Sequence, residues 1–508
     1  MTPTSTASTN PLLEDLEVER RAPPCILVVF GASGDLTSRK LVPALAALAA
    51  NRQLSARFSV VGVARTAMTD EEFRAKMLEA VPKPSATWER LVGGFRYVSG
   101  DYTEADTFDR LRTVLAEIDA DLGTGGNRVH YLATVPEVFA GIAASMAEHG
   151  FNTPVDGGGF VRMVVEKPFG RDLASALALD EQLHAAFHEE QIYRIDHYLG
   201  KETVQNVLAL RFANSIFEPV WNRQYVDHVQ ITVAESLGVG HRGGFYETAG
   251  ALRDIVQNHV LQVLALTVME PPATMDAKGI RDEKVKALRA VDILTPDEVA
   301  TEVVRAQYGP GWVEGEEVGG YRAEADVAPD SCTETYLGMR VRVDNWRWAG
   351  VPFYLRTGKR LPKRMTEVAM EFQRVPHLPF GSTGSEALGP NALVLRIQPD
   401  EGITLRFGAK VPGQAFRLRS VSMDFSYGAA FLEQAPDAYE RLLLDAMVGD
   451  PTLFIRADEV EQAWRVVAPI QEAWAADTTP LATYAAGTWG PAEADTLLHQ
   501  DRRSWRSP

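Results

Sequence analysis

The chain has 508 residues, which is too long for one hydrophobic core of ordinary size, so we expect at least two domains. Hydrophobic residues make up 45% of it and charged residues 23%, as in soluble globular proteins. The formal net charge of -17 argues against nucleic acid or an anionic membrane as a partner, because both would repel the protein.

The two cysteines, Cys25 and Cys332, are far apart in the sequence, and we do not expect a disulfide. Residues Met1 to Pro24 are rich in Ser, Thr, Pro and charge and lack the apolar core of an export signal, so they predict a disordered tail. No apolar run approaches the roughly 18 residues of a membrane helix. Together these features indicate a soluble protein of the reducing cytoplasm.

From Cys25 onward the chain alternates strands with helices. The apolar run Cys25 to Phe30 ends in a glycine turn, which is typical of a buried parallel strand. The other predicted elements are strands at Phe58–Ala64, Phe95–Val98, Val129–Ala133 and Phe160–Glu166, and helices at Leu41–Ala50, Thr69–Ala80 and Ala105–Ile118. This order predicts an α/β domain over residues 25–200, a Rossmann-like doubly wound parallel sheet.

The pattern changes after about Gly200. Residues 337 to 344 alternate apolar with polar or small side chains, which predicts a strand with one wet face, whereas the acidic, glycine-rich stretch Gly309 to Ser331 predicts an exposed excursion. The other predicted elements are helices at Lys201–Asn214 and Ala249–Met269, and strands at Asp227–Glu235, Val368–Gln373, Leu393–Gln398 and Gly402–Phe407. We therefore expect residues 201–508 to form an α+β domain on a large, mainly antiparallel sheet.

The turn after the first strand reads Gly31-Ala32-Ser33-Gly34-Asp35-Leu36. Glycines there let backbone N–H groups approach a pyrophosphate at a helix start. The Gly-x-x-Gly spacing is shorter than the full fingerprint, so a loop needing two positive φ angles is the alternative. Arg65 ends the second strand, where NAD enzymes carry an acid for the ribose 2′-hydroxyl. A guanidinium at this position suits the 2′-phosphate of NADP, so Arg65 predicts NADP as the cofactor. The alternative is an ordinary surface arginine at a strand end.

Two polar clusters lie farther along. Asp196, His197, Tyr198 and Lys201 crowd around a helix start in the motif Arg194 to Glu202, which favours an anion such as a substrate phosphate over a merely solvated turn. The second cluster is Asp254, Gln257, Asn258 and His259, within an apolar helix. Polar groups there need buried partners, so His259 is either a satisfied core residue or a base oriented by Asp196.

His184 and His188 have the i, i+4 spacing of metal ligands. No third ligand is evident, so we expect a solvated helix face and no metal.

The chain closely resembles glucose-6-phosphate dehydrogenases of bacterial type from about Cys25 nearly to its end. The stretches that carry the resemblance are Gly31–Leu36 with Arg39-Lys40-Leu41, Glu166–Gly170, Arg194–Glu202, Arg253–His259 and Asp344–Phe353. The nine-residue Arg194 motif is the most specific of them.

The resemblance implies oxidation of D-glucose 6-phosphate by NADP to 6-phosphoglucono-1,5-lactone, the first step of the oxidative pentose phosphate route. His259 would remove the C1 hydroxyl proton while hydride leaves C1, and Asp196 would hold the imidazole tautomer. The implied substrate contacts are His197, Tyr198 and Lys201 for the phosphate and Lys167, Glu235, Asp254, Lys359, Arg364 and Gln398 for the rest. The implied cofactor contacts are Gly31, Ser33, Gly34, Asp35, Leu36, Arg65, Asp101, Tyr102, Tyr131 and Lys167.

The resemblance also implies a cis peptide bond before Pro168 and a homodimer or homotetramer formed through the large sheet. Met365 stands where relatives with a second, structural NADP carry a basic residue, so we do not expect that second site. Two alternatives remain: a related oxidoreductase acting on an unphosphorylated sugar, and an inert NADP-binding regulator.

Overall fold

This computed structural model describes residues 20–155, 158–377, 388–413, 417–431, 436–476 and 480–507. The chain forms two compact units. The first comprises Met1–Val165, Ala186–Tyr193 and Tyr439–Pro451, and the second comprises Glu166–Ala185, Arg194–Ala438 and Thr452–Pro508. The domain limits expected at residues 24, 200 and 508 stay a prediction.

A six-stranded sheet forms the centre of the first unit, in the order β3-β2-β1-β4-β5-β6. Its strands are β1 Cys25–Phe30, β2 Phe58–Ala64, β3 Arg96–Ser99, β4 Arg128–Leu132, β5 Val161–Val165 and β6 Ile192–Arg194. The pairs from β3 through β5 are parallel. All six residues of β1 are buried, because both neighbouring strands and the layers above and below cover them. The predicted doubly wound sheet is confirmed.

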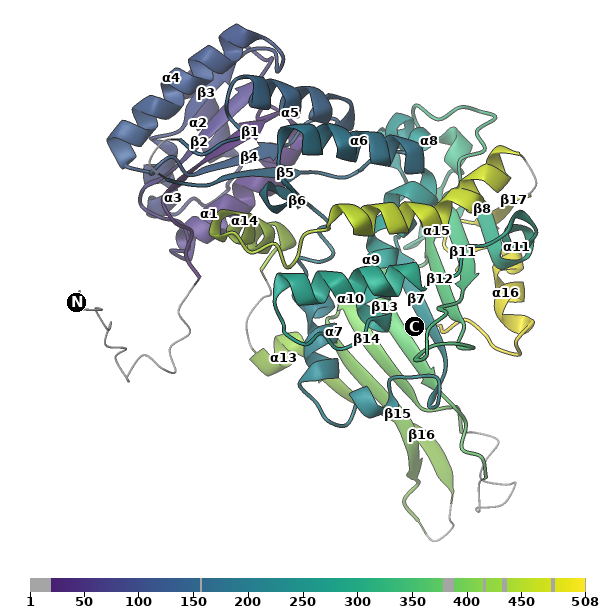
Figure 1. Cartoon of the computed structure of the whole chain (residues 1–508). Helices are drawn as coiled ribbons and strands as arrows, with labels where there is room; N and C mark the ends of the chain where they lie inside the picture. The colour runs from purple at the N-terminus through teal and green to yellow at the C-terminus, as the bar shows by residue number, and fades with distance from the viewer. Residues whose placement is uncertain are drawn as a thin grey trace, which may run out of the picture. The chain divides into compact units, whose positions relative to one another are not determined.

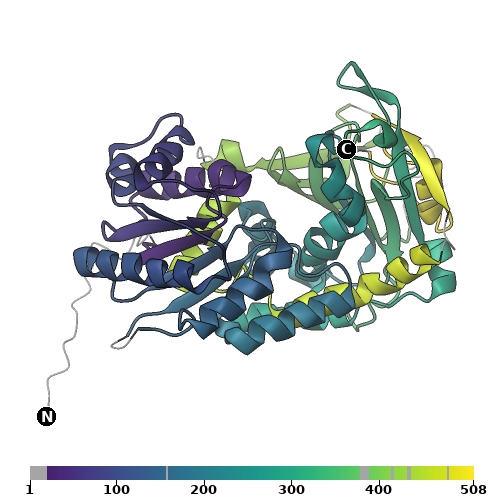
Figure 2. The ribbon, with the colours of Figure 1, turned by 90° about the horizontal axis from the view of Figure 1, so that it is seen from above.

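Helices cover both faces of this sheet. They are α1 Val42–Ala50, α2 Asp70–Glu79, α3 Ala86–Val92, α4 Ala105–Leu122, α5 Phe139–Glu148 and α14 Ala438–Val448, with a short π-helix at Thr37–Leu41 (η2) and 3-10 turns at Pro136–Val138 (η3) and Glu189–Gln191 (η4). Figure 2 shows α1 to α3 on one side of the sheet and α4 and α5 on the other, as right-handed crossovers in this strand order require.

The expectation of a disordered tail to Pro24 is wrong at its last residues. Ala22 is buried and its N–H donates to the carbonyl of Gln53 at 2.8 Å. Arg20 pairs with Asp445 at 2.7 Å and Asp450 at 2.8 Å. These contacts fix the segment just before β1, whereas residues 1–19 lie outside the described part of the chain.

The second unit is built on a nine-stranded sheet in the order β16-β15-β14-β13-β7-β12-β11-β8-β17. Its strands are β7 Val226–Ala234, β8 Val303–Gly309, β11 Tyr336–Val341, β12 Phe353–Gly358, β13 Met365–Phe372, β14 Ala392–Gln398, β15 Gly402–Lys410, β16 Leu418–Ser426 and β17 Leu481–Ala485. Only the pairs β7–β12 and β8–β17 are parallel among the described pairs, so the predicted mainly antiparallel sheet is confirmed.

Helices pack against this sheet and against one another. They are α6 Leu173–Ala186, α7 Glu202–Phe212, α8 Gly243–Ala251, the π-helix η7 Leu252–Val260, α9 Leu261–Val268, α10 Ala277–Arg289, α11 Pro296–Glu302, α13 Tyr427–Phe431, α15 Ala457–Ala475 and α16 Ala492–His499, with 3-10 turns at Glu218–Val220 (η5), Gly240–Arg242 (η6) and Tyr321–Ala323 (η8). α7 packs on β14, η7 packs on β7 and β12, and α15 packs on α10, α11 and η7. Figure 1 shows β15 and β16 extending past these helices. None of the helices in the described ranges has the length and apolar character needed to cross a bilayer.

Three local expectations for the second unit are wrong. The single helix expected over Ala249–Met269 is interrupted at Gly250 (φ 63°, ψ -179°) and continues as a π-helix and then an α-helix. The stretch Gly309–Ser331 contains the hairpin β9 Gly311–Val313 and β10 Glu316–Val318, and Tyr321 is completely buried against Tyr246 and Tyr308. The wet face expected on β11 is partly covered, because α16 packs over it and buries Gly338.

Candidate active site

The centre of the candidate site is a buried pair, Asp196 and His259, 63 residues apart in the sequence. Asp196 follows β6 and His259 lies near the end of η7. Nδ1 of His259 lies 2.5 Å from Oδ1 of Asp196, and both side chains are 1% exposed. The same carboxylate oxygen accepts the backbone N–H of Tyr198 at 2.8 Å. The predicted contact between these two remote stretches is therefore present.

Lys167 occupies the other side of the imidazole. Its Nζ lies 3.0 Å from Nε2 of His259 and donates to the carbonyl of Asp254 at 2.9 Å and to its Oδ1 at 3.2 Å. An ammonium has no lone pair, so Nε2 must accept and the ring proton belongs on Nδ1, facing Asp196. This hydrogen-bond network assigns the tautomer in which Nε2 can act as a base. The peptide bond between Lys167 and Pro168 is cis, as predicted.

The π-helix explains how one lysine reaches both Asp254 and His259. These two residues are five positions apart, and in an α-helix they would point roughly 140° away from each other. A π-helix closes its hydrogen bonds from i to i+5, so residues with this spacing face the same side. Both side chains therefore meet the Lys167 ammonium.

Burial and neighbouring charge act in opposite directions on the ionisable groups. Burial lowers the pKa of His259 below 6.5, although the Asp196 carboxylate opposes this, so the imidazole is neutral at pH 7. For Asp196, burial would raise the pKa, but the interactions with the His259 ring and the Tyr198 N–H outweigh it and keep the carboxyl ionised. Burial would also raise the pKa of Asp254, yet Lys167 and Lys359 hold it at about 2.

A set of hydrogen-bond donors lies next to this pair. The ring of Tyr198 stacks on that of His259 with centroids 4.2 Å apart, and the ring of His197 meets it edge-on at 4.4 Å. Lys201 Nζ donates to Oε1 of Gln398 at 2.5 Å, and Arg364 donates to the same oxygen at 3.4 Å. Two cations and two aromatic donors therefore converge at one place, which suits a phosphate dianion.

Glu235 and Lys359 form a second charged pair at the ends of the adjacent strands β7 and β12. Lys359 Nζ lies 2.5 Å from Oε2 of Glu235, and the lysine side chain is only 4% exposed. Backbone hydrogen bonds also join the two segments, since the N–H of Glu235 donates to the carbonyl of Gly358 at 3.0 Å. This pair offers both a donor and an acceptor for hydroxyl groups.

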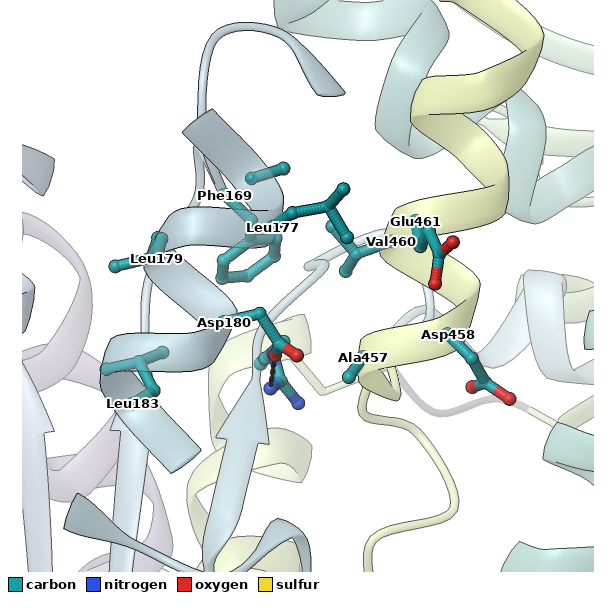
Figure 3. A pocket seen from close by; sticks show the side chains of 11 residues that line it. Phe169, Leu177, Leu179, Asp180, Leu183, Ala457, Asp458, Val460 and Glu461 are labelled. Atoms are coloured by element: carbon teal, nitrogen blue, oxygen red, sulfur yellow. Dashed lines mark hydrogen bonds and ion pairs between the residues drawn. The ribbon is translucent and has the colours of Figure 1, made fainter. Parts of the chain in front are cut away.

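Arg194, the first residue of the specific motif, points away from the site. Its guanidinium donates to Asp180 on α6 at 2.6 Å. The two residues line a cavity of about 170 Å³ between α6 and α15, shown in Figure 3, which includes none of the candidate site residues. Arg194 thus anchors the strand that leads to Asp196.

The nucleotide turn of the first unit fits a pyrophosphate. Gly31 has φ 87°, and a Cβ there would lie 2.4 Å from the carbonyl oxygen of Ala133, so only glycine suits this turn. Gly34, Asp35 and Leu36 lead into η2, and the Asp35 side chain is 87% exposed. The backbone can therefore approach a ligand closely at a helix start.

The end of β2 adds cationic and hydroxyl groups beside this turn. Arg65 is exposed at the strand end, and Thr66 Oγ1 donates to Ser33 Oγ at 3.2 Å. Lys76 reaches across from α2, with its Nζ 2.6 Å from the Ser33 carbonyl. Sequence reasoning missed Thr66 and Lys76, because a lysine in a charged amphipathic helix carries no signal for a ligand.

The remaining cofactor candidates differ in accessibility. Tyr102 packs its ring against Phe30 at 6.1 Å, close to the turn, whereas the Asp101 carboxylate accepts the Thr103 hydroxyl at 2.8 Å. Tyr131 is completely buried within β4.

The helix face expected for His184 and His188 is wrong, because α6 ends at Ala186 and His188 lies beyond it, directly before η4. His184 Nδ1 lies 3.1 Å from Asp180 Oδ2, four residues earlier on the same helix. Asp196, His197 and His259 do bring ligand atoms within 4.8 Å of one another, but the facing atoms of Asp196 and His259 are already hydrogen-bonded together. The expectation of no metal stays a prediction.

Comparison with known proteins gives matches along nearly the whole chain. Residues 28–206 match the family model "Glucose-6-phosphate dehydrogenase, NAD binding domain", and residues 208–506 match "Glucose-6-phosphate dehydrogenase, C-terminal domain". Glucose-6-phosphate 1-dehydrogenase 2 of Mycobacterium tuberculosis is 49% identical over 507 residues, covering 98% of both chains. Glucose-6-phosphate 1-dehydrogenase of Aggregatibacter actinomycetemcomitans is 48% identical over 492 residues, covering 96% of this chain and 98% of the relative.

Two solved structures are similar over the same extent. One is a glucose-6-phosphate dehydrogenase in complex with its substrate glucose-6-phosphate, with a TM-score of 0.88 and 32% identity, covering 96% of this chain and 99% of that one. The other is glucose-6-phosphate 1-dehydrogenase from Mycobacterium avium, with a TM-score of 0.82, 37% identity and the same coverage.

Proposed function

The chain belongs to the glucose-6-phosphate dehydrogenase family, and from this membership we propose that it oxidises D-glucose 6-phosphate at C1 with NADP, forming 6-phosphoglucono-1,5-lactone. The observation that carries the proposal is the neutral His259 imidazole, whose Nδ1 proton is held by Asp196 and whose unprotonated Nε2 accepts from Lys167. A base of this kind is suited to removing a hydroxyl proton near neutral pH.

In the proposed reaction, Nε2 of His259 takes the C1 hydroxyl proton while hydride leaves C1 and the C1–O bond becomes a carbonyl. Asp196 stabilises the imidazolium that forms, because its carboxylate already accepts the Nδ1 proton. Lys167 now donates to Nε2 and would exchange that hydrogen bond for one to a sugar oxygen. A bound nicotinamide supplies the hydride acceptor.

The substrate phosphate is assigned to His197, Tyr198 and Lys201. Their donors converge beside His259, and Arg364 and Gln398 complete the cluster. Asp254 and the pair Glu235–Lys359 would bind sugar hydroxyls, since each presents a charged group able to orient an O–H.

NADP rather than NAD is proposed from the groups at the end of β2. Arg65 and Lys76 place two cations, and Ser33 and Thr66 two hydroxyls, around the position where the 2′ substituent of an adenosine ribose lies in this fold. Arg65→Ala should therefore raise the KM for NADP relative to the KM for NAD. An unchanged ratio of the two constants would contradict this assignment.

The proposed compartment is the cytoplasm and the proposed assembly a homodimer or homotetramer. Both cysteines are free, with Cys25 buried and Cys332 exposed, which suits a reducing compartment. Three apolar side chains of β16 are exposed on the large sheet, where a second copy could cover them.

The direct test measures NADPH or NADH absorbance with four mixtures: glucose 6-phosphate or glucose, each with NADP or NAD. The proposal expects the highest kcat/KM for glucose 6-phosphate with NADP. Equal turnover of glucose would favour an oxidoreductase for unphosphorylated sugars. No reduction in any mixture, by protein that still binds NADP, would favour an inert regulator.

A further inference from the structure

We infer that Glu334 is a positioning residue for the catalytic centre, because it fixes the start of the π-helix that carries Asp254 and His259. The inference rests on the roles proposed above for those two residues. Glu334 lies two residues before β11, in the large-sheet unit, and its side chain does not reach the cluster around Lys167 through any hydrogen bond shown for the described residues. It is 4% exposed.

Glu334 satisfies two backbone donors at the beginning of η7. Its carbonyl accepts the N–H of Ala251 at 3.0 Å, and its Oε1 accepts the N–H of Leu252 at 2.9 Å. The first N–H groups of a helix have no partner within the helix, and a buried one without a partner is costly. Glu334 therefore determines where the π-helix begins.

Gly250 is matched to this carboxylate. It breaks the last turn of α8, two residues before η7, with φ 63°, and a Cβ at that position would lie 2.3 Å from Oε1 of Glu334. Only glycine combines this backbone conformation with so close an approach. The break in the helix at Gly250 therefore leaves the space that the capping carboxylate of Glu334 occupies.

Thr335, the residue after Glu334, holds the backbone of Lys359, which belongs to the charged pair Glu235–Lys359. The carbonyl of Thr335 accepts the N–H of Lys359 at 3.0 Å, and the N–H of Thr335 donates to Ala306 on β8 at 2.8 Å. Lys359 in turn pairs with Glu235. One dipeptide, Glu334-Thr335, therefore holds both the π-helix start and the backbone of Lys359 against the sheet.

This cap differs from the other side-chain caps in the described part of the chain. Thr69, Ser85, Asp172, Asp276 and Thr295 cap α2, α3, α6, α10 and α11 from the residue directly before each helix. The cap of η7 comes from 82 residues away and is a buried carboxyl, whose pKa burial raises and the Leu252 N–H lowers in part. A distant, buried acid is a costly way to satisfy one N–H, which fits a role in placing the helix relative to the sheet.

The first test compares Glu334→Ala with Glu334→Gln in the steady-state assay. Loss of the cap should shift the π-helix start, and misplacement of a catalytic group by about 1 Å can cost on the order of 100-fold in rate. We expect E334A to lower kcat about 10- to 100-fold with the KM for glucose 6-phosphate changed less than about 3-fold. E334Q keeps an acceptor oxygen and should recover most of kcat. Wild-type kcat in E334A would overturn the inference.

The second test is a double-mutant cycle with His259→Asn. If Glu334 acts through His259, E334A should cost less than about 3-fold in the H259N background. A purely structural role predicts the same loss of kcat in both backgrounds, and that result would overturn the inference. H259N with wild-type kcat would instead overturn the proposed base, leaving the E334A result to decide on Glu334.

Asp276→Ala is the matched control, because it removes the local cap of α10, a helix without candidate site residues. It should lower the unfolding temperature and leave kcat unchanged. If E334A does not fold, Glu334→Asp replaces it, since it keeps the charge and withdraws the oxygen by one methylene. The same loss of kcat is then expected from E334D, and wild-type kcat in E334D would overturn the inference.

Discussion

His259 combines two properties that usually exclude each other: it is fully buried and it is a polar base with a partner at each ring nitrogen. Asp196 takes the Nδ1 proton and Lys167 donates to Nε2. Because burial lowers the pKa of the imidazole, Nε2 is unprotonated throughout the neutral range. Activity should therefore fall only when the pH drops below the ordinary histidine value of about 6.5.

Replacing His259 with Asn should lower kcat by about 10²- to 10⁴-fold, because it removes the proposed general base while keeping a polar side chain of similar size. The KM for glucose 6-phosphate should change little, since the phosphate donors remain. Steady-state kinetics at pH 7.5 would measure both constants. His241→Asn, at an exposed histidine on η6, is the control and should behave as wild type.

Lys201→Ala should give the opposite phenotype. Its ammonium lies among the donors assigned to the phosphate, so its loss should raise the KM for glucose 6-phosphate about 10- to 100-fold and leave kcat within a few-fold. Lys278→Ala is a suitable control, because Lys278 is 83% exposed and pairs only with Asp282 on its own helix among the contacts described. A kcat defect in K201A without a change in KM would contradict the assignment.

Candidate site residues that lie in polar sequence motifs could be predicted from the sequence, whereas those that stand outside such motifs could not. Asp196 and His259 lie in motifs crowded with polar residues, which drew attention to both. Glu334 and Lys76 stand alone among ordinary neighbours, and their contacts depend on chain segments 82 and 43 residues away. Only the folded chain shows these contacts.

At the scale of elements, β4 carries a histidine in an unusual setting. His130 is completely buried beside the rings of Phe30 and Phe151, and within the described part of the chain neither nitrogen of its imidazole makes a hydrogen bond of good geometry. Burial lowers the pKa of His130 to about 3. The unfolded chain, with a histidine pKa near 6.5, therefore binds the proton more readily at any pH between these values.

The free energy of unfolding should consequently fall as the pH drops below about 6.5, and His130 alone should account for about 2 kcal/mol of the difference between pH 7 and pH 5. His130→Leu removes the titrating group, so its stability should decline less over this range. Urea midpoints of the first unfolding transition at both pH values, for wild type and variant, give the comparison. An identical decline in both proteins would rule out this role of His130.

The hydrophobic pattern of the sequence predicted regular strands and helices, but it did not predict the π-helix or the buried side chain of an irregular loop. β1 and β2 have the predicted limits, because each is an uninterrupted apolar run buried on both faces. The pattern of Leu252 to Leu261 is apolar at spacings that suit an α-helix and a π-helix alike. Tyr321 looked exposed within its glycine-rich, acidic surroundings, yet its hydroxyl donates to Glu247 at 2.5 Å and its ring is buried.

At the scale of the molecule, the large sheet leaves an apolar face on its edge strand. Val421, Met423 and Phe425 alternate along β16, so they point to the same side, and they are 37%, 62% and 37% exposed. A contiguous exposed apolar stripe on a sheet is a common mark of an interface between subunits. This is the surface on which the proposed homodimer or homotetramer would form.

Met423→Asp should convert the assembled protein to monomers, because it places a charge at the centre of this stripe. Light scattering coupled to size-exclusion chromatography would measure the mass at micromolar concentration. Ser422→Asp is the control, because Ser422 is exposed on the same strand but alternates to the opposite side from the stripe. An M423D protein with the wild-type mass would exclude β16 as the interface.

The π-helix restricts how this active site could be reproduced elsewhere. In a standard α-helical scaffold, Asp254 and His259 would have to be four positions apart, so copying the segment letter for letter would aim one of the two side chains away from the lysine. A designer who grafts these groups must shorten the spacing by one residue. For the same reason, deleting one residue between Asp254 and His259 while the segment stays a π-helix would turn one of the two side chains away from Lys167.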